Sequence, residues 1–224
     1  MPGLFITFEG GEGSGKTTQL KALLAQLRGG GRDAVETRDP GGTGIGKRIR
    51  ELLLDRENAG MAATAELFLY EASRAQLVQE RIRPALAAER IVLCDRFTDS
   101  TVAYQGYGRG LDLDLVARLN ALATDGLRPD LTFLLDLDPV VGLARATQRV
   151  TRLRGRHDRI EEEVLGFHQR VRAGYRAVAA VEPERVRLLD ASRGMAEIEA
   201  DIRRHVEARL RSFPGPSAGI PPSG

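Results

Sequence analysis

Residues 10–17 read Gly-Gly-Glu-Gly-Ser-Gly-Lys-Thr and directly follow the apolar segment 4–9 (LFITFE). They match the pattern G-x-x-x-x-G-K-[ST], and they lie between a predicted strand and a helix predicted over about 16–27. Glycines in such a loop let backbone N–H groups approach phosphate oxygens, and the helix N-terminus adds the positive end of its dipole. The stretch therefore predicts a P-loop that binds a purine nucleoside triphosphate. The competing interpretation is a glycine-rich surface turn.

Each polar residue of this loop suits one part of a nucleotide. We expect Lys16 to act as a catalytic cation on the β and γ phosphates, and the Thr17 hydroxyl to bind Mg²⁺. The residues expected to contact the nucleotide are Gly10, Gly11, Glu12, Gly13, Ser14, Gly15, Lys16, Thr17 and Thr18.

Outside this loop the chain alternates predicted strands and helices. Further strands are expected at 34–37, 91–95, 131–136 and 186–190, and helices at about 45–55, 62–88 (interrupted near Pro84), 112–124, from Pro139 onward, 160–181 and 195–210. This order predicts an α/β fold of the P-loop NTPase type, a parallel sheet of about five strands with helices on both faces. We expect one domain over 1–212, with an arginine-rich lid at about 145–159, and a disordered tail at 213–224.

The composition excludes several classes of protein. The 224 residues include 33 Lys plus Arg and 31 Asp plus Glu, a formal charge of +2, which argues against a dedicated nucleic-acid or membrane-surface binder. The single Cys94 excludes an intramolecular disulfide. No apolar run approaches the roughly 20 residues that span a bilayer, and the N-terminus lacks a signal-peptide pattern. We therefore expect a cytoplasmic protein.

A P-loop Mg²⁺ site commonly uses a carboxylate at the end of a nearby strand. Asp95 and Asp136 both follow apolar strands. We favour Asp95, because Arg96 leaves the strand beside it, whereas no basic residue adjoins Asp136. The alternative for Asp95 is a structural role in capping the next turn.

Two arginines are placed to bind a second anion. Arg38 and Arg96 end the second and third predicted strands, and parallel strands bring their carboxyl ends to the P-loop edge of the sheet. Two permanently charged guanidinium groups there, each with paired N–H donors, suit the binding of a monophosphate. The alternative is that both are solvated, since the chain holds 30 arginines.

Two helical patterns could complete such a site. Tyr70 and Arg74 are four residues apart, so a ring and a guanidinium share one helix face and could stack on a base and donate to its edge. Taken alone, such a pair is more often a buried Tyr beside a surface Arg. Arg145, Arg149 and Arg152 fall on one face of a later helix, which suits either a closing lid or an ordinary solvated face.

At this point the sequence resembles the bacterial-type thymidylate kinases, of the P-loop nucleoside monophosphate kinase superfamily. The resemblance covers about 4–211, through the segments FEGGEGSGKTTQ, TRDPGGT, LFLYEASRAQLV, DRF, STVAYQGYGRG, RPDLTFLLDLDP, DRIE and FHQRVRAGY. It implies transfer of a phosphoryl group from ATP to thymidine 5′-monophosphate (dTMP), with Mg²⁺, for dTTP synthesis. It also implies a homodimer.

The resemblance assigns further roles on the acceptor side. Arg38 and Arg96 resemble ligands of the acceptor phosphate, and Glu12 resembles a P-loop carboxylate near the acceptor sugar and phosphate. Tyr104 matches an aromatic residue that lies against the sugar and disfavours a 2′-hydroxyl.

The base is assigned to four other residues by the same resemblance. Tyr70 stands where the family stacks an aromatic ring, usually Phe, on thymine, and Arg74 matches the donor to thymine O4. Ser100 and Thr101 match positions that line the base.

The lid is the least defined part of the resemblance. The P-loop holds no Arg, as in the subgroup that supplies its catalytic Arg from the lid. We favour Arg149, with Arg145 and Arg159 as alternatives, because the segment between Arg149 and Asp158 is several residues longer than the family pattern. A second departure is Asp39, where the family usually has Glu.

Three other functions stay open at this point. The first is a P-loop kinase for another nucleotide, which a screen of monophosphate acceptors would distinguish. The second is a P-loop switch protein, which would hydrolyse nucleotide slowly without an acceptor. The third is an inactive relative, against which the intact Gly15-Lys16-Thr17 argues.

Overall fold

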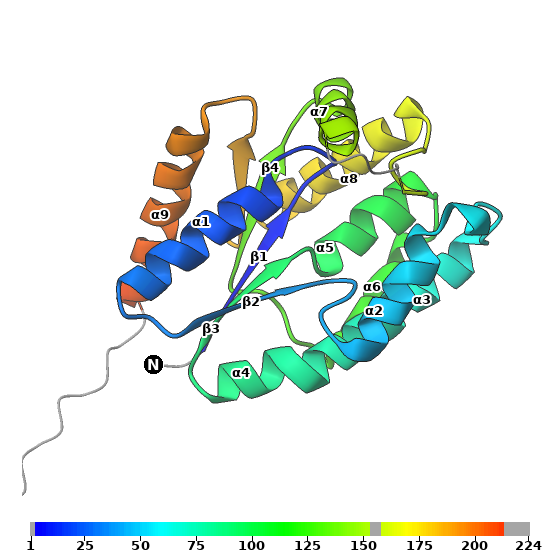
Figure 1. The fold of residues 1–224 in the computed structure, drawn as a ribbon. Coiled ribbons are helices and arrows are strands. Elements are labelled where there is room, and N and C mark those ends of the chain that lie inside the picture. Colours follow the sequence, from blue (N-terminus) through cyan, green and yellow to red (C-terminus); the bar gives the residue numbers. More distant parts are fainter. Residues whose placement is uncertain (1–2, 153–157, 213–224) are drawn as a thin grey trace, which may run out of the picture.

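The computed structural model describes residues 3–152 and 158–212, apart from the side chains of residues 149 and 150 (Figure 1). The expected tail at 213–224 and residues 153–157 of the expected lid lie outside these residues. The strands are β1 (Leu4–Glu9), β2 (Ala34–Arg38), β3 (Ile91–Asp95), β4 (Leu131–Asp136) and β5 (Val186–Asp190). The helices are α1 (Lys16–Gly29), α2 (Gly44–Leu54), α3 (Ala63–Leu77), α4 (Arg83–Ala87), α5 (Thr98–Thr101), α6 (Leu113–Thr124), α7 (Pro139–Arg152), α8 (Leu165–Val181) and α9 (Met195–Ser212).

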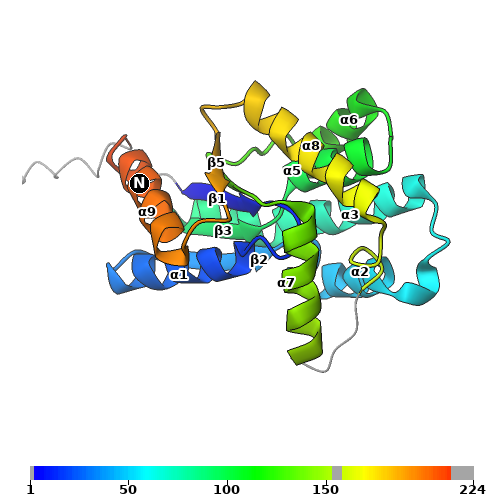
Figure 2. The ribbon, with the colours of Figure 1, turned by 90° about the horizontal axis from the view of Figure 1, so that it is seen from above.

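The five strands form one parallel sheet in the order β2-β3-β1-β4-β5. Alternate side chains of β1 point to opposite faces, as a strand requires. Ile6 and Phe8 pack with residues of α1 and α9, whereas Phe5 packs with the residues that follow α3. Figure 2 shows the result, with α1 and α9 on one side of the sheet and α3, α5, α6 and α8 on the other. The predicted α/β fold is confirmed.

The register of the sheet brings the functional candidates together. Arg38 pairs with Asp95 across β2 and β3, Phe8 pairs with Asp95 across β1 and β3, and Glu9 pairs with Leu134 of β4. The loops that follow these strands therefore leave the sheet at one edge, beside the P-loop. This is the edge at which open α/β sheets bind ligands.

Two expected helices differ from their predicted bounds. The expected helix over 62–88 changes to a π-helix at Val78–Ile82, one turn before Pro84. A proline has no N–H and its ring clashes with the carbonyl four residues earlier, so the distortion precedes it. The short helix α5 and the π-helix Val102–Gly108 were not predicted.

The expected helix over 160–181 begins only at Leu165. The Asp158 carboxylate accepts the backbone N–H groups of Ile160 and Glu161, which offers the chain a turn in place of a helix. The Ile160 side chain is buried in the core against α8 and holds that turn in place.

A buried ion-pair cluster fixes the turn around residue 159 to α3. The fully buried Glu66 accepts hydrogen bonds from Arg159 at 2.5 Å, from Arg109 at 3.0 and 3.1 Å, and from Gln105 at 2.7 Å. By contrast, Glu162 pairs with Arg56 on the surface.

We predict that Glu66→Gln destabilises the protein by about 3–5 kcal/mol, because an amide N–H₂ would face buried arginine donors. Glu162→Gln is the matched control and should cost less than about 1 kcal/mol, since exposed pairs contribute little. Urea unfolding followed by circular dichroism measures both. Equal costs for the two variants would contradict the role of the buried cluster.

Candidate functional site

The P-loop has the conformation that its sequence predicts. Gly13 and Gly15 have φ angles of +65° and +91°, which L side chains rarely adopt. Lys16 begins α1, is 8% exposed, and donates from Nζ to the Gly11 carbonyl at 2.8 Å. The ammonium therefore lies over the loop, where the phosphates of a nucleotide would bind.

Burial is the main influence on the charge of Lys16. Burial, and then repulsion from Arg96, lower the pKa of Lys16 to about 8, although Glu12, Asp95 and Glu9 oppose the shift. An anion bound in the loop would remove this repulsion. The site therefore favours phosphate electrostatically before any contact with a base is made.

The loop also packs tightly against the start of α7. A Cβ on Gly13 would lie 2.1 Å from the Gly142 carbonyl oxygen, and a Cβ on Gly142 would lie 2.3 Å from the Glu12 carbonyl oxygen. Backbone atoms cannot yield as a flexible side chain can, so both positions require glycine. Gly142 therefore determines how closely α7 approaches the phosphate loop.

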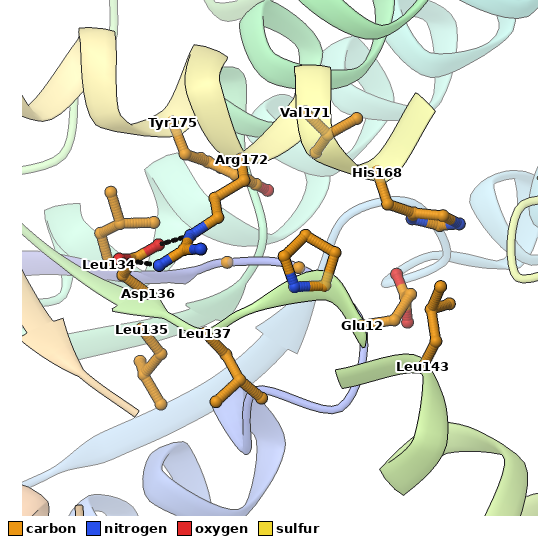
Figure 3. Close-up of a pocket in the computed structure, with 13 residues that line it drawn as sticks. Glu12, Leu134, Leu135, Asp136, Leu137, Leu143, His168, Val171, Arg172 and Tyr175 are labelled. Carbon is orange, nitrogen blue, oxygen red and sulfur yellow. Dashed lines mark hydrogen bonds and ion pairs between the residues drawn. The ribbon is translucent and has the colours of Figure 1, made fainter. Parts of the chain in front are cut away.

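Thr17 and Asp95 lie together beside the loop. The Thr17 hydroxyl donates to Oδ2 of Asp95 at 2.6 Å. Asp136, the alternative Mg²⁺ ligand, instead accepts two bonds from Arg172 of α8, at 2.7 and 2.9 Å (Figure 3). Among the described residues no group of three His, Cys, Asp or Glu side chains could hold a metal ion. A hydroxyl and one carboxylate do fit a Mg²⁺ ion whose other ligands are phosphates and water.

A cavity of about 590 Å³ opens over the loop, which is large enough for part of a nucleotide. Its lining residues include the P-loop together with Arg38, Arg50, Asp95, Arg96, Arg145 and Asp158. The cavity of Figure 3, on the α8 side of the loop, is about 20 Å³ and has room for about one water molecule, so we do not consider it a ligand site.

Arg96 is the most heavily bonded cation of the site. Its Nη2 donates to Oε1 of Glu12 at 2.7 Å and to the Tyr104 hydroxyl at 3.0 Å, and its Nη1 donates to the Gly10 carbonyl at 3.1 Å. Its guanidinium also lies 4.9 Å from the centre of the Tyr104 ring. Arg96 thus contacts both the P-loop and the wall of the acceptor side.

Glu12 is the anionic counterpart of this arrangement. Burial alone would raise the pKa of its carboxyl, but Arg96 and Lys16, with the Tyr104 hydroxyl, lower it to about 2. Glu12 is therefore ionised at any physiological pH. It accepts hydrogen bonds and cannot serve as a proton donor.

Arg38 and Arg50 add further positive charge around the large cavity. Both line the large cavity with Arg96, although Arg38 is exposed and Arg50 half-buried. Burial, and then repulsion from Arg38, lower the pKa of Arg50. Three guanidiniums around one space suit a second phosphate group.

A second, smaller cavity of about 90 Å³ lies behind these arginines. It is lined by all the predicted base-binding residues, and the full set comprises Glu12, Asp39, Pro40, Arg50, Leu54, Tyr70, Arg74, Arg96, Ser100, Thr101, Tyr104, Gln105, Asp158 and Ile160. The structure therefore brings Tyr70, Arg74, Ser100, Thr101 and Tyr104 into one pocket, next to the expected phosphate ligands.

Arg74 is buried, not exposed, and its orientation is fixed. Nε donates to Asp39 at 2.6 Å, Nη1 to Glu71 at 2.9 Å and to Asn120 at 2.7 Å, and Nη2 to the Phe97 carbonyl at 3.3 Å. These bonds use four of the five N–H groups of the guanidinium. Within the described parts of the chain, one N–H of Nη2 is left to donate into the pocket.

The three lid candidates have different positions. Arg145 lines the large cavity, and its Nη1 donates to the Ala191 carbonyl at 3.3 Å. Arg159 is 5% exposed and bonded to Glu66 and to the Leu53 carbonyl, so it does not face the phosphate loop here. The Arg149 side chain lies outside the described residues.

Sequence reasoning missed Arg50, Gln105, Gly142 and Glu9. Arg50 lies within a helix in a chain with 30 arginines, and no local pattern distinguishes it. Gln105 follows Tyr104 directly in the STVAYQGYGRG segment, which was a usable signal. The requirement for glycine at 142 arises from a contact 129 positions away in the chain and has no local signature.

We predict that Gly142→Ala raises the KM for the nucleotide by roughly 10-fold or more, because the new Cβ would displace α7 or the P-loop. Gly166→Ala in α8 is the matched control, since a Cβ there meets no atom closer than 3.8 Å, and it should change KM less than about twofold. Steady-state kinetics with varied ATP measure both. Wild-type kinetics for Gly142→Ala would show that the loop tolerates the displacement.

Comparisons with known proteins agree with this geometry. A family model described as thymidylate kinase matches residues 8–202. The thymidylate kinase of Solidesulfovibrio magneticus is 58% identical over 191 residues, which cover 84% of this chain and 91% of that protein. The thymidylate kinase of Geobacter sulfurreducens is 55% identical over 213 residues, which cover 95% of this chain and 99% of that protein.

The similarity extends to a solved structure. The crystal structure of thymidylate kinase from Ehrlichia chaffeensis matches with a TM-score of 0.72 and 33% identity, over 92% of this chain and 99% of that one. Among the described residues, no helix combines the length and apolar character needed to cross a membrane. The family match covers most of the chain and includes the P-loop and both pockets, so this chain belongs to the thymidylate kinase family.

Proposed function

We propose that this chain carries out the reaction of its family, dTMP to dTDP, with ATP bound at the P-loop and dTMP in the pocket between Arg96 and Arg74. The main support is the adjacency of two anion sites that share Glu12 and Arg96. A switch protein needs one nucleotide site, whereas a nucleotide kinase needs a second phosphate site beside the first. The product would be the direct precursor of dTTP.

The reaction needs positioning and charge neutralisation more than covalent chemistry. An oxygen of the dTMP phosphate would attack the γ-phosphorus of ATP, and the bond from that phosphorus to the β–γ bridging oxygen would break to release ADP. The attacking phosphate is already an anion at neutral pH, so no general base is required. Lys16 and the P-loop amides would stabilise the charge on the transferred group.

Mg²⁺ would be held by Thr17 and Asp95 and would supply positive charge at the β and γ phosphates. Arg145 is the lid arginine whose described position supports a role in transfer, because it lines the same cavity as Lys16. Arg149 stays a candidate for that role. Arg159 would need to leave Glu66 before it could take part.

The proposed pocket would favour thymine over cytosine. Thymine presents the acceptor O4 where cytosine presents an amino donor, and Arg74 can only donate. A dCMP ligand would leave the buried guanidinium and the amino group facing each other. We expect roughly 30- to 1000-fold discrimination in kcat/KM, equivalent to about 2–4 kcal/mol.

We predict that Arg74→Lys narrows the dTMP/dCMP ratio of kcat/KM at least 10-fold, because a lysine can pair with Asp39 and Glu71 but lacks the fork that reaches the base. Tyr70→Ala removes a stacking surface common to both bases and should lower both activities while preserving the ratio. A coupled ADP-release assay across dTMP, dUMP, dCMP, dAMP and dGMP measures the effect. If both variants reduced the dTMP/dCMP ratio of kcat/KM equally, or if the wild-type protein preferred dCMP, the assignment of the base pocket would be overturned.

We further propose that the chain forms a homodimer through α2, α3 and α6. Helix α3 packs against both α2 and α6. All three helices present apolar side chains to the solvent. Phe68 of α3 is 55% exposed and Leu122 of α6 is 78% exposed, and Leu52 of α2 and Leu113 of α6 are exposed as well. An apolar surface of this kind is typical of a protein interface.

We predict that Phe68→Glu converts the dimer to a monomer, because a charge would be buried at the interface. Val181→Glu, an exposed apolar position on α8, is the matched control and should not change the assembly. Size-exclusion chromatography with light scattering measures the mass. A monomeric wild-type protein, or a dimeric Phe68→Glu, would contradict this surface.

A further inference from the structure

Glu9 is a buried carboxylate that the proposed reaction does not use. It ends β1 directly before the P-loop, and it is 0% exposed. Burying a carboxylate is costly unless hydrogen bonds compensate. Its partners therefore indicate what it does.

Three donors converge on this carboxylate. Oε1 accepts the backbone N–H of Phe97 at 2.7 Å, and Oε2 accepts the hydroxyls of Ser100 at 2.6 Å and of Tyr175 at 3.0 Å. Phe97 and Ser100 belong to the segment after β3, and Tyr175 belongs to α8, within the FHQRVRAGY segment. Glu9 thus links three separate parts of the chain behind the P-loop.

The same two hydroxyls also contact Arg96. Nη1 of Arg96 donates to the Tyr175 hydroxyl at 2.9 Å and to the Ser100 hydroxyl at 3.3 Å. The hydroxyls lie 2.7 Å from each other, and each has one proton. Whichever of them donates to the other, at least one donates to Glu9 and both keep lone pairs for Arg96. The carboxylate therefore orients the guanidinium through these hydroxyls.

Glu9 also fixes the backbone of Arg96. Arg96 has φ +71°, a strained conformation for an arginine. The turn is held by the bond from Phe97 N–H to Glu9 and by the bond from Arg96 N–H to the Phe8 carbonyl at 3.0 Å. This turn directs the Arg96 side chain back over Gly10 and Glu12.

We propose that Glu9 is a positioning residue for the acceptor phosphate, which acts by fixing both the backbone and the guanidinium of Arg96 through Phe97, Ser100 and Tyr175. The inference rests on the proposed function, in which Arg96 binds the phosphate of dTMP. Neither Glu9 nor Tyr175 lines the large cavity or the base pocket. Both reach the site through hydrogen bonds to residues that do, Glu9 through Ser100 and Tyr175 through Ser100 and Arg96.

The charge state of Glu9 offers a specific readout. Burial, and then repulsion from Asp99, raise the pKa of Glu9 to about 7, against the opposing effects of Ser100, Arg96 and the Phe97 amide. The other groups that interact with it electrostatically are Lys16, Cys94 and Tyr175. The carboxylate is present above about pH 7 and is lost below it, and protonation removes an acceptor for the hydroxyls. Positioning of Arg96 should therefore weaken as the pH falls.

The test is Glu9→Gln, which keeps the shape but not the charge. At about pH 8.5 we expect the KM for dTMP to rise roughly 10- to 100-fold, while the KM for ATP changes less than about threefold. Tyr175→Phe should raise the KM for dTMP less, and its effect should be non-additive with that of Glu9→Gln. Glu36→Gln, an exposed glutamate of β2, is the matched control and should match wild type.

The pH profile separates positioning from a general loss of structure. Between about pH 8.5 and about pH 5.5, the wild-type KM for dTMP should approach that of Glu9→Gln, because wild-type Glu9 becomes neutral as well. The phosphate of dTMP titrates equally in assays of both proteins, so its effect cancels in the ratio of their KM values for dTMP. A ratio that stays constant across this range, or additive effects of the two variants, would overturn the inference.

A separate variant tests the proposed function on which this inference rests, namely that Arg96 binds the phosphate of dTMP. Arg96→Lys should raise the KM for dTMP if Arg96 binds the acceptor phosphate. If Arg96→Lys leaves that KM unchanged, the proposed function fails at this residue. If Arg96→Lys raises it and Glu9→Gln does not, the proposed function stands and the role of Glu9 is wrong.

Discussion

The ion pair between Glu12 and Arg96 joins the two halves of the site. Glu12 belongs to the P-loop, and Arg96 belongs to the turn that ends β3. Because β1 and β3 are neighbours in the sheet, these two residues meet only when the strands pair in the observed register. Any shift of that register would separate the nucleotide loop from the acceptor pocket. The relative position of the two proposed substrate sites is therefore a consequence of strand pairing.

The cations at this edge of the sheet repel one another, and bound phosphate groups would relieve that repulsion. Lys16 and Arg50 both have lowered pKa values, with burial as the largest cause and a neighbouring arginine as the next. Anionic carboxylates relieve only part of this repulsion. Two bound phosphate groups would relieve the rest. Burial strengthens these interactions, because the low local dielectric screens them less than water does.

Local patterns in the sequence were enough to predict the sheet, the P-loop and the strand-end residues Arg38, Asp95 and Arg96. Those features depend on neighbours in the chain, such as apolar runs, glycine spacing and the order of elements. The resemblance located Tyr70, Arg74, Ser100, Thr101 and Tyr104, which the structure then places around one pocket. The local pattern alone left the environment of Arg74 open, because its partners Asp39 and Asn120 are far from it in sequence. The contacts of Gly142 with the P-loop and of Glu9 with Phe97 are of the same long-range kind.

The arginines of the expected lid illustrate this limit most clearly. A helical pattern treats Arg145, Arg149 and Arg152 as one face and gives Arg159 no special place. In the structure Arg159 is drawn into the core because Glu66 is buried there and needs a counter-charge, whereas Arg145 stays beside the phosphate cavity. The difference is set by a carboxylate on α3, almost a hundred residues away. A run of arginines in a sequence therefore predicts that cations lie near a site. Which of these arginines can contact a ligand depends on which of them pair with carboxylates buried in the folded core.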